Sequence, residues 1–122
     1  MKLLPTIEAP LGEPRAVRLD EAVAYQPGAV VSRSLVRHPA GGVTLFAFAA
    51  GQGLSEHVAP FDALVHLLEG RARIVLGGVP HELAAGDAIL MPAGRPHALT
   101  ALTPFKMMLT MIRPGEAARV PG

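Results

Sequence analysis

The feature that most constrains this chain is a short segment in which glycine and proline recur at fixed distances from a histidine. Gly86 comes six residues before Pro92, Gly94 follows after two more residues, and His97 lies three residues beyond Gly94. Glycine allows the positive φ that tight turns require, and proline fixes φ at about −65°. The spacing therefore predicts a turn, a short strand and a second turn that leads into a histidine.

A related arrangement occurs earlier in the chain, where Gly51 precedes His57 by six residues and Gly70 closes the segment. Together the two segments resemble the paired motifs of the cupin family, G-x5-H-x-H-x3,4-E-x6-G and G-x5-P-x-G-x2-H-x3-N. The resemblance covers about residues 40–112. Three positions that the family fills with histidine, glutamate and asparagine hold alanine in this chain: Ala59, Ala63 and Ala101.

The resemblance implies an all-β fold, a double-stranded β-helix of the jelly-roll kind. In cupins the two motifs lie side by side and direct their ligands into one end of the barrel, where they hold a divalent metal. Carried over to this chain, that arrangement places His57 and His97 at the barrel mouth as the two retained ligand positions. The scaffold signal is nearly complete, and the catalytic signal is only half present.

Twelve prolines and thirteen glycines separate short runs of β-favouring residues, which is typical of a sandwich or barrel. We expect an extended N-terminal arm at residues 1–15, one barrel domain at 16–113 and a tail at 114–122. In residues 105–112 the apolar side chains alternate, so that one face of this strand is expected to be inward. The predicted strands are Leu19–Tyr25, Ala29–Arg37, Val43–Ala49, Ala63–Leu68, Arg71–Leu76, Val79–Leu83, Ala88–Met91 and Phe105–Ile112.

The charge and cysteine content exclude several classes of function. Eleven basic and ten acidic side chains leave a net charge of +1, so we expect neither nucleic acid nor a membrane surface as a partner. The absence of cysteine excludes disulfides and thiolate metal sites, and leaves histidine and carboxylate as metal ligands. No signal peptide or membrane span is recognisable in the sequence, and we expect a cytoplasmic protein.

Two histidines alone hold a divalent metal weakly, because catalytic sites usually supply three protein ligands. A metal bound by His57 and His97, whether Fe, Ni, Mn or Zn, is therefore expected to be weakly held or absent. Asp62 and His66 are the candidates for a third ligand. His66 is also a candidate ligand-binding residue, although strict strand alternation would turn it away from Ala63 and toward an interface.

Two functional hypotheses follow. In the first, the barrel binds a small organic molecule through His57 and His97, in a cavity that the three alanines make roomier and more apolar. In the second, the protein is a metal-dependent enzyme of the oxygenase or isomerase type that uses the same two histidines and a third ligand. Histidine also serves as an acid or base near neutral pH, so metal-free isomerase or lyase chemistry stays open. The sequence does not identify the ligand.

We also expect a homodimer. In the strand predicted at Ala63–Leu68, Leu64 and Leu68 share the face opposite Ala63 and Val65, so both faces of the strand are apolar. A barrel interior covers only one of these faces, and the other requires a second cover. The N-terminal arm could supply that cover, but the resemblance favours a two-fold partner.

Overall fold

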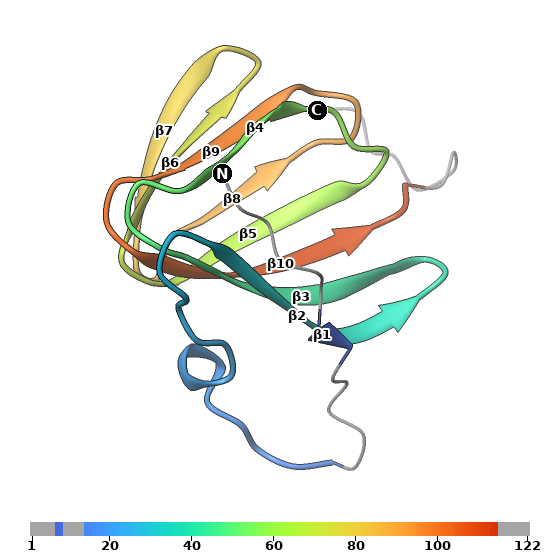
Figure 1. The fold of residues 1–122 in the computed structure, drawn as a ribbon. Helices are drawn as coiled ribbons and strands as arrows, with labels where there is room; N and C mark the ends of the chain where they lie inside the picture. Colours follow the sequence, from blue (N-terminus) through green and yellow to red (C-terminus); the bar gives the residue numbers. More distant parts are fainter. Residues whose placement is uncertain (1–6, 9–13, 115–122) are drawn as a thin grey trace.

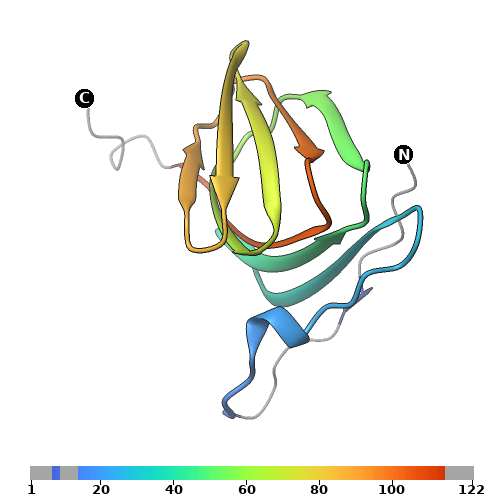
Figure 2. The ribbon, with the colours of Figure 1, turned by 90° about the vertical axis from the view of Figure 1, so that its left-hand side faces the viewer.

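The computed structural model describes residues 7–8 and 14–114, which form two facing β-sheets (Figure 1). The six-stranded sheet has the order β1-β2-β3-β10-β5-β8, and the four-stranded sheet has the order β4-β9-β6-β7. Seen end on, the strands surround a common interior, which is the double-stranded β-helix that the sequence predicts (Figure 2). The strands are β1 (Ile7–Glu8), β2 (Val30–His38), β3 (Gly41–Phe48), β4 (Gly53–His57), β5 (Asp62–Glu69), β6 (Arg71–Leu76), β7 (Val79–Ala84), β8 (Ala88–Met91), β9 (His97–Ala101) and β10 (Phe105–Ile112).

Strand β10 shows how the sequence pattern sets the two faces of the six-stranded sheet. It pairs antiparallel with β3 on one side and with β5 on the other. Phe105 and Met107 belong to the core between the sheets, whereas Met108 packs in a separate cluster on the outer face. The alternation predicted for this strand is therefore confirmed, because successive side chains of a strand point to opposite faces.

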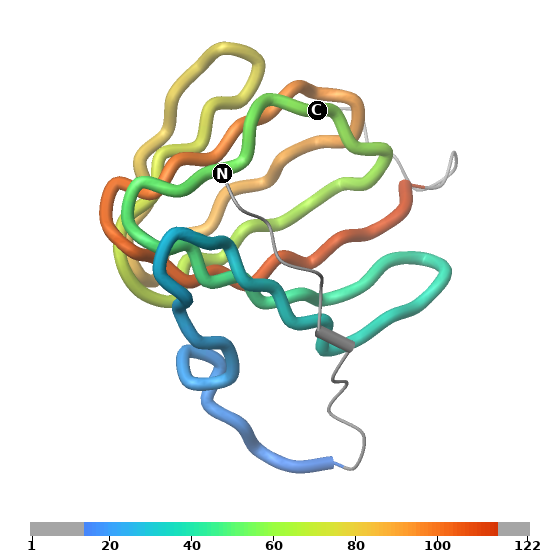
Figure 3. Tube along the Cα trace, viewed as in Figure 1, coloured from blue at the N-terminus to red at the C-terminus, as the bar shows by residue number. Residues whose placement is uncertain are grey.

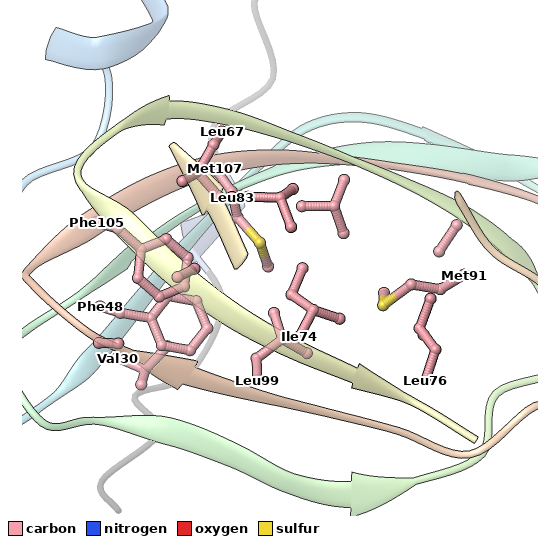
Figure 4. Close-up of a cluster of buried hydrophobic side chains, with 14 residues drawn as sticks. Val30, Phe48, Leu67, Ile74, Leu76, Leu83, Met91, Leu99, Phe105 and Met107 are labelled. Carbon is pink, nitrogen blue, oxygen red and sulfur yellow. The ribbon is translucent and has the colours of Figure 1, made fainter. Parts of the chain in front are cut away.

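The core between the two sheets is built from aliphatic side chains and a pair of phenylalanines. The rings of Phe48 and Phe105 stack with their centroids 4.4 Å apart and their planes 10° apart. Figure 4 shows this pair at one end of the cluster and Met91 and Leu76 at the other. Burial of each large apolar side chain contributes about 1.5–3 kcal/mol, so this cluster is the main source of stability.

The strand predicted at Leu19–Tyr25 is wrong. This segment forms a 3-10 helix, η1 (Leu19–Glu21), and then a bend, outside the six-stranded sheet beside β2 and β3 (Figure 2). Its carbonyl groups bond to side chains instead of to a neighbouring strand: Lys106 Nζ donates to the Asp20 carbonyl over 2.6 Å, and Arg33 donates to the Ala22 carbonyl over 2.9 Å. The apolar side chains that favour a strand in the sequence instead cover the outer face of the six-stranded sheet.

The cover on the outer face is a second apolar cluster. Val23 is buried there with Leu35 of β2 and with Leu45 and Ala47 of β3. Leu19 and Tyr25 pack against this cluster. Leu68 of β5 also joins this cluster, so the segment covers part of the apolar outer face that the sequence analysis noted. Leu64 of the same strand stays 45% exposed.

The ends of the chain fall largely outside the described residues. In the predicted arm at residues 1–15, the backbone of Ile7–Glu8 forms β1, which runs parallel to β2. The tail predicted at 114–122 lies outside the described residues from position 115 onward. Among the residues that the structure does describe, no helix is long and apolar enough to cross a membrane.

Candidate functional site

His57 and His97 lie side by side at one end of the barrel. His57 is the last residue of β4 and His97 is the first of β9, and the two are partners in the antiparallel register. The same end holds the turn between β2 and β3 and the connections from β4 to β5 and from β8 to β9 (Figure 3). We call this end the barrel mouth.

Hydrogen bonds between two loops align the histidines. Gly94, in the turn before β9, donates its backbone N–H to the Ala59 carbonyl in the loop after β4, over 2.9 Å. Ala93 in the same turn donates to Asp62 Oδ1, also over 2.9 Å. The loop after His57 and the turn before His97 are thus tied together, which explains why the spacing of the second motif brings its histidine to the first.

The two imidazole rings meet through their Nε2 atoms. These atoms are 2.9 Å apart, and the ring centroids are 4.1 Å apart with the planes at 69°. His97 is 5% exposed, whereas His57 is exposed. The pair therefore joins the apolar interior to the solvent at the mouth.

The other nitrogen of each ring faces a backbone carbonyl. His57 Nδ1 lies 2.8 Å from the Ser55 carbonyl oxygen, and His97 Nδ1 lies 3.2 Å from that of Arg95. A carbonyl oxygen can only accept, so these contacts assign the ring proton of each neutral histidine to Nδ1. Both Nε2 atoms then present lone pairs to each other, and the pair favours a proton or another cation between them.

The environment disfavours a second positive charge on this pair. Burial lowers the pKa of His97, and the charge of His57 lowers it further, while the bond to the Arg95 carbonyl acts in the opposite direction. Desolvation is the largest of these effects because the charged form of histidine loses hydration in the barrel. The two rings therefore share at most one proton, at the contact between their Nε2 atoms.

Apolar side chains lie next to His97 in its own sheet and line the facing sheet. Leu76 of β6 is the register partner of His97 on the side away from His57. On the facing sheet, Ala63 of β5 lies opposite Met91 of β8 and Met111 of β10. Ala63 is 4% exposed and belongs to the core cluster, so the family's glutamate position is here a buried methyl group.

The described residues do not complete a catalytic metal site. They contain no group of three or more histidine, cysteine, aspartate or glutamate side chains that could hold a metal ion. Asp62, one candidate third ligand, uses Oδ1 to accept the bond from Ala93. The donor set at the mouth is two imidazole nitrogens, one fewer than the three protein ligands of a typical catalytic site. It does not fit a tightly held resident metal.

His66, the other candidate third ligand, lies on the face of β5 opposite to Ala63. It pairs with Ala88 of β8 and with Met108 of β10, which packs in the outer cluster. Its neighbours along the strand, Val65 and Leu67, are fully buried in the core between the sheets. The structure therefore does not bring His66 to the histidine pair.

A cavity of about 600 Å³ opens at the barrel mouth, and no motif in the sequence indicates it. It lies between the β2–β3 hairpin, the end of β10 and the loop that connects β4 to β5. Its basic residues are Arg37 and His38 at the end of β2 and Arg113 directly after β10. They are far apart in the sequence, and the antiparallel pairing of the strands brings them together. The lining residues are Ser34, Val36, Arg37, His38, Pro39, Gly41, Gly42, Thr44, Phe61, Met111 and Arg113.

Solved structures with the same fold include two uncharacterised bacterial proteins and a named barrel domain. A conserved Streptococcus pyogenes protein of unknown function is 35% identical, with a TM-score of 0.80, and the match covers 84% of this chain and 90% of that one. A cupin superfamily protein from Desulfitobacterium hafniense is 26% identical, with a TM-score of 0.79 and coverages of 84% and 94%. A cupin 2 conserved barrel domain protein from Leptotrichia buccalis is 37% identical, with a TM-score of 0.74 and coverages of 76% and 45%.

No curated protein is significantly similar to the chain in sequence. The family model for the cupin domain matches residues 44–113, which is more than half of the chain and includes both histidines. This match agrees with the double-stranded β-helix and with the meeting of the two motifs at the barrel mouth. The chain belongs to the cupin family.

Proposed function

We propose that this protein binds a small organic molecule at the barrel mouth, with His57 and His97 as its polar handle. The observation that carries the proposal is the convergence of the two Nε2 atoms, 2.9 Å apart, while each Nδ1 faces a backbone carbonyl. Small-molecule sites are typically apolar concave surfaces with a few polar groups that converge on one point. The buried Leu76 and Met91 supply the apolar surface beside this pair.

The histidine pair can recognise a ligand without a metal. With one proton at Nε2, one ring donates and the other accepts, so the pair matches a ligand group that can do both, such as a hydroxyl or an amide. The ligand would replace the contact between the two rings by one bond to each. The apolar surroundings strengthen these bonds because they exclude competing water.

The test is a fragment screen by ligand-detected NMR on the wild type and two variants. His97→Phe keeps the ring volume without the nitrogens, and His57→Ala removes the exposed partner. We expect both to weaken binding of the detected fragments by about 10-fold or more, the effect of losing a buried polar partner. His81→Ala on the exposed strand β7 is the matched control. Unchanged binding by His97→Phe would contradict the proposal.

The second candidate is a metal-dependent enzyme that uses His57 and His97. The observation in its favour is the contact of each Nδ1 with a carbonyl, which is how metal-ligating histidines are usually oriented. The third protein ligand that this candidate requires is not found among the described residues. Elemental analysis of untagged protein separates the two: a stoichiometric, tightly held Fe, Ni, Mn or Zn would replace the first proposal by the second.

A further inference from the structure

We propose that the ligand of this barrel is a small carboxylate with an apolar body, and that its carboxylate group lies in the mouth cavity between Arg37 and Arg113. The inference rests on the proposed function in one respect, that the same molecule reaches the histidine pair. The cavity volume of about 600 Å³ lies in the range of small-molecule sites, about 300–1,000 Å³.

Basic side chains line the cavity. Among the described residues, those that line it include Arg37, His38 and Arg113 and none that is acidic, although the chain has almost equal numbers of basic and acidic side chains. The described lining of this cavity is therefore basic. A concave site lined by one sign of charge attracts ligands of the opposite sign.

Arg113 is held in place. Its backbone N–H donates to the Ala40 carbonyl over 2.7 Å, and its Nε lies 3.4 Å from the Pro39 carbonyl. Its guanidinium carbon lies 5.0 Å from the centre of the Phe61 ring. A guanidinium fixed by the hairpin and by an aromatic face loses little freedom when it binds, and its planar fork matches a carboxylate in a bidentate way.

Two residues with hydroxyl groups also line the cavity. Ser34 of β2 and Thr44 of β3 are register partners, and both line the cavity. Ser34 is 5% exposed, so a hydroxyl group occupies a nearly buried position on the inner face of the six-stranded sheet. The cavity therefore offers hydroxyl groups as well as guanidinium groups that can donate hydrogen bonds to a carboxylate.

Two apolar residues that line the cavity lie at the same end of the barrel as the histidines. Phe61 lines the cavity and ends the short loop that starts after His57. Met111 also lines it, and this residue lies opposite Ala63 on the inner face of the sheet. The cavity and the pair thus share the barrel mouth, with Phe61 and Met111 as the apolar contacts for the body of the ligand.

Calorimetric titration of the intact protein with three carboxylates, each beside its uncharged amide, tests the inference. The probes are benzoate, phenylacetate and hexanoate against benzamide, phenylacetamide and hexanamide. We expect at least one carboxylate to bind about 10-fold more tightly than its amide, and added salt to weaken its binding. Absence of carboxylate binding, or equal affinity for acid and amide, would overturn the inference.

Variants locate the charge contact. Arg113→Gln and Arg37→Gln should each weaken carboxylate binding by about 10-fold and leave amide binding unchanged. Arg15→Gln makes the same charge change at an exposed residue that does not line the cavity, and it should have no effect. Equal loss in the Arg15 variant would show a general charge effect and overturn the site.

The two proposals can fail separately. If the amides bind and His97→Phe removes their binding while Arg113→Gln changes nothing, the anion site is wrong and the histidine handle stands. If carboxylates bind through Arg113 but His97→Phe changes the binding of no amide and no fragment, the anion site stands and the histidine handle is wrong.

Discussion

At the scale of single residues, the glycines of the two motifs share a left-handed backbone conformation. Gly70 and Gly86 have φ of 79° and 94°, and Gly51 and Gly94 have 73° and 79°. Their surroundings differ, however. A Cβ at Gly70 would lie 2.0 Å from the Pro104 carbonyl oxygen, whereas a Cβ at Gly86 would meet nothing within 4 Å. The motif therefore keeps some glycines for backbone conformation alone and Gly70 for close packing as well.

This difference predicts unequal effects of the same substitution. Gly86→Ala should lower the free energy of unfolding by about 1–2 kcal/mol, the cost of the left-handed conformation for a residue with a Cβ. Gly70→Ala should cost clearly more, because the backbone must also move away from the new methyl group. Urea unfolding of the two variants measures both values, and equal destabilisation would show that the contact with Pro104 is not a constraint.

The chemistry of the mouth also depends on single residues. His57 and His97 fall at histidine positions of the motifs that the sequence resembles, whereas Ala63 falls at a glutamate position and is buried in the core. The fold thus brings the histidines of the two motifs together although alanine stands at three other motif positions. The remaining imidazoles are oriented by the carbonyl groups of Ser55 and Arg95, which are independent of any side-chain replacement.

At the scale of elements, the segment that contains η1 is fixed to the sheet by a polar contact at the edge of the outer cluster. The Tyr25 hydroxyl donates to Glu69 Oε2 over 2.7 Å, and Lys106 Nζ lies 4.9 Å from the centre of the tyrosine ring. Burial raises the pKa of Tyr25 strongly, and the hydrogen bond to Glu69 and the charge of Glu69 raise it further. The neutral phenol is therefore the form that the folded protein stabilises.

This shift predicts a loss of stability at alkaline pH. The contribution of Tyr25 is fully present below its ordinary pKa of about 10 and is lost as pH rises above that value, because the unfolded chain loses the phenol proton first. Tyr25→Phe should cost about 0.5–1.5 kcal/mol at neutral pH and reduce the alkaline loss. Since Tyr25 is the only tyrosine and the chain has no tryptophan, phenolate absorption reports this residue alone.

The control for this prediction is the same titration in denaturant. The phenolate signal of the unfolded wild type should appear at lower pH than that of the folded protein. If both signals appear at the same pH, the contact between Tyr25 and Glu69 does not stabilise the folded state.

At the scale of the whole molecule, the outer face of the six-stranded sheet is covered over only part of its area. The segment with η1 covers one part, and beyond it Leu64 of β5 and Leu90 of β8 are register partners that are 45% and 52% exposed. Thr110 of β10 continues this row from Leu64, and Val43 and Val36 continue it across β3 and β2. The row crosses five strands without a charged residue.

We propose that a second copy of the chain covers this row in a two-fold homodimer. Leu90, Leu64 and Val36 are the exposed apolar side chains of this row, and they favour association. A two-fold contact lets the same row face itself. Light scattering at micromolar concentration should give twice the chain mass of 12.7 kDa. The double variant Leu64→Lys and Leu90→Lys should be a monomer.

The matched control is Val79→Lys on the four-stranded sheet, where Val79 is 55% exposed and outside the row. It should stay dimeric. A monomeric wild type would reject the dimer. His66→Ala tests the neighbouring position: a larger monomer fraction in this variant would support an interface role of His66.

Local sequence alone determined most of the strands and the family, because glycine and proline act on the backbone at their own positions. The hairpin of β2 and β3 and the strands β5 to β8 and β10 follow the predicted runs closely. Alternation also separated the two faces of β10. These features depend on residues that are close together in the sequence, so a local pattern is enough to predict them.

Tertiary structure decided the rest. Strands β4 and β9 are short, and β9 follows directly after Pro96. The local sequence therefore predicts no strand at His97–Ala101, and this strand is defined by its pairing with β6 and β4. The segment Leu19–Tyr25 has a strand-like apolar content, yet it packs on a sheet face instead of pairing. The register of β4 with β9 sets the 2.9 Å contact of the histidines, and antiparallel pairing gathers Arg37 with Arg113. Such contacts join residues far apart in sequence, and only the packing of the two sheets brings them together.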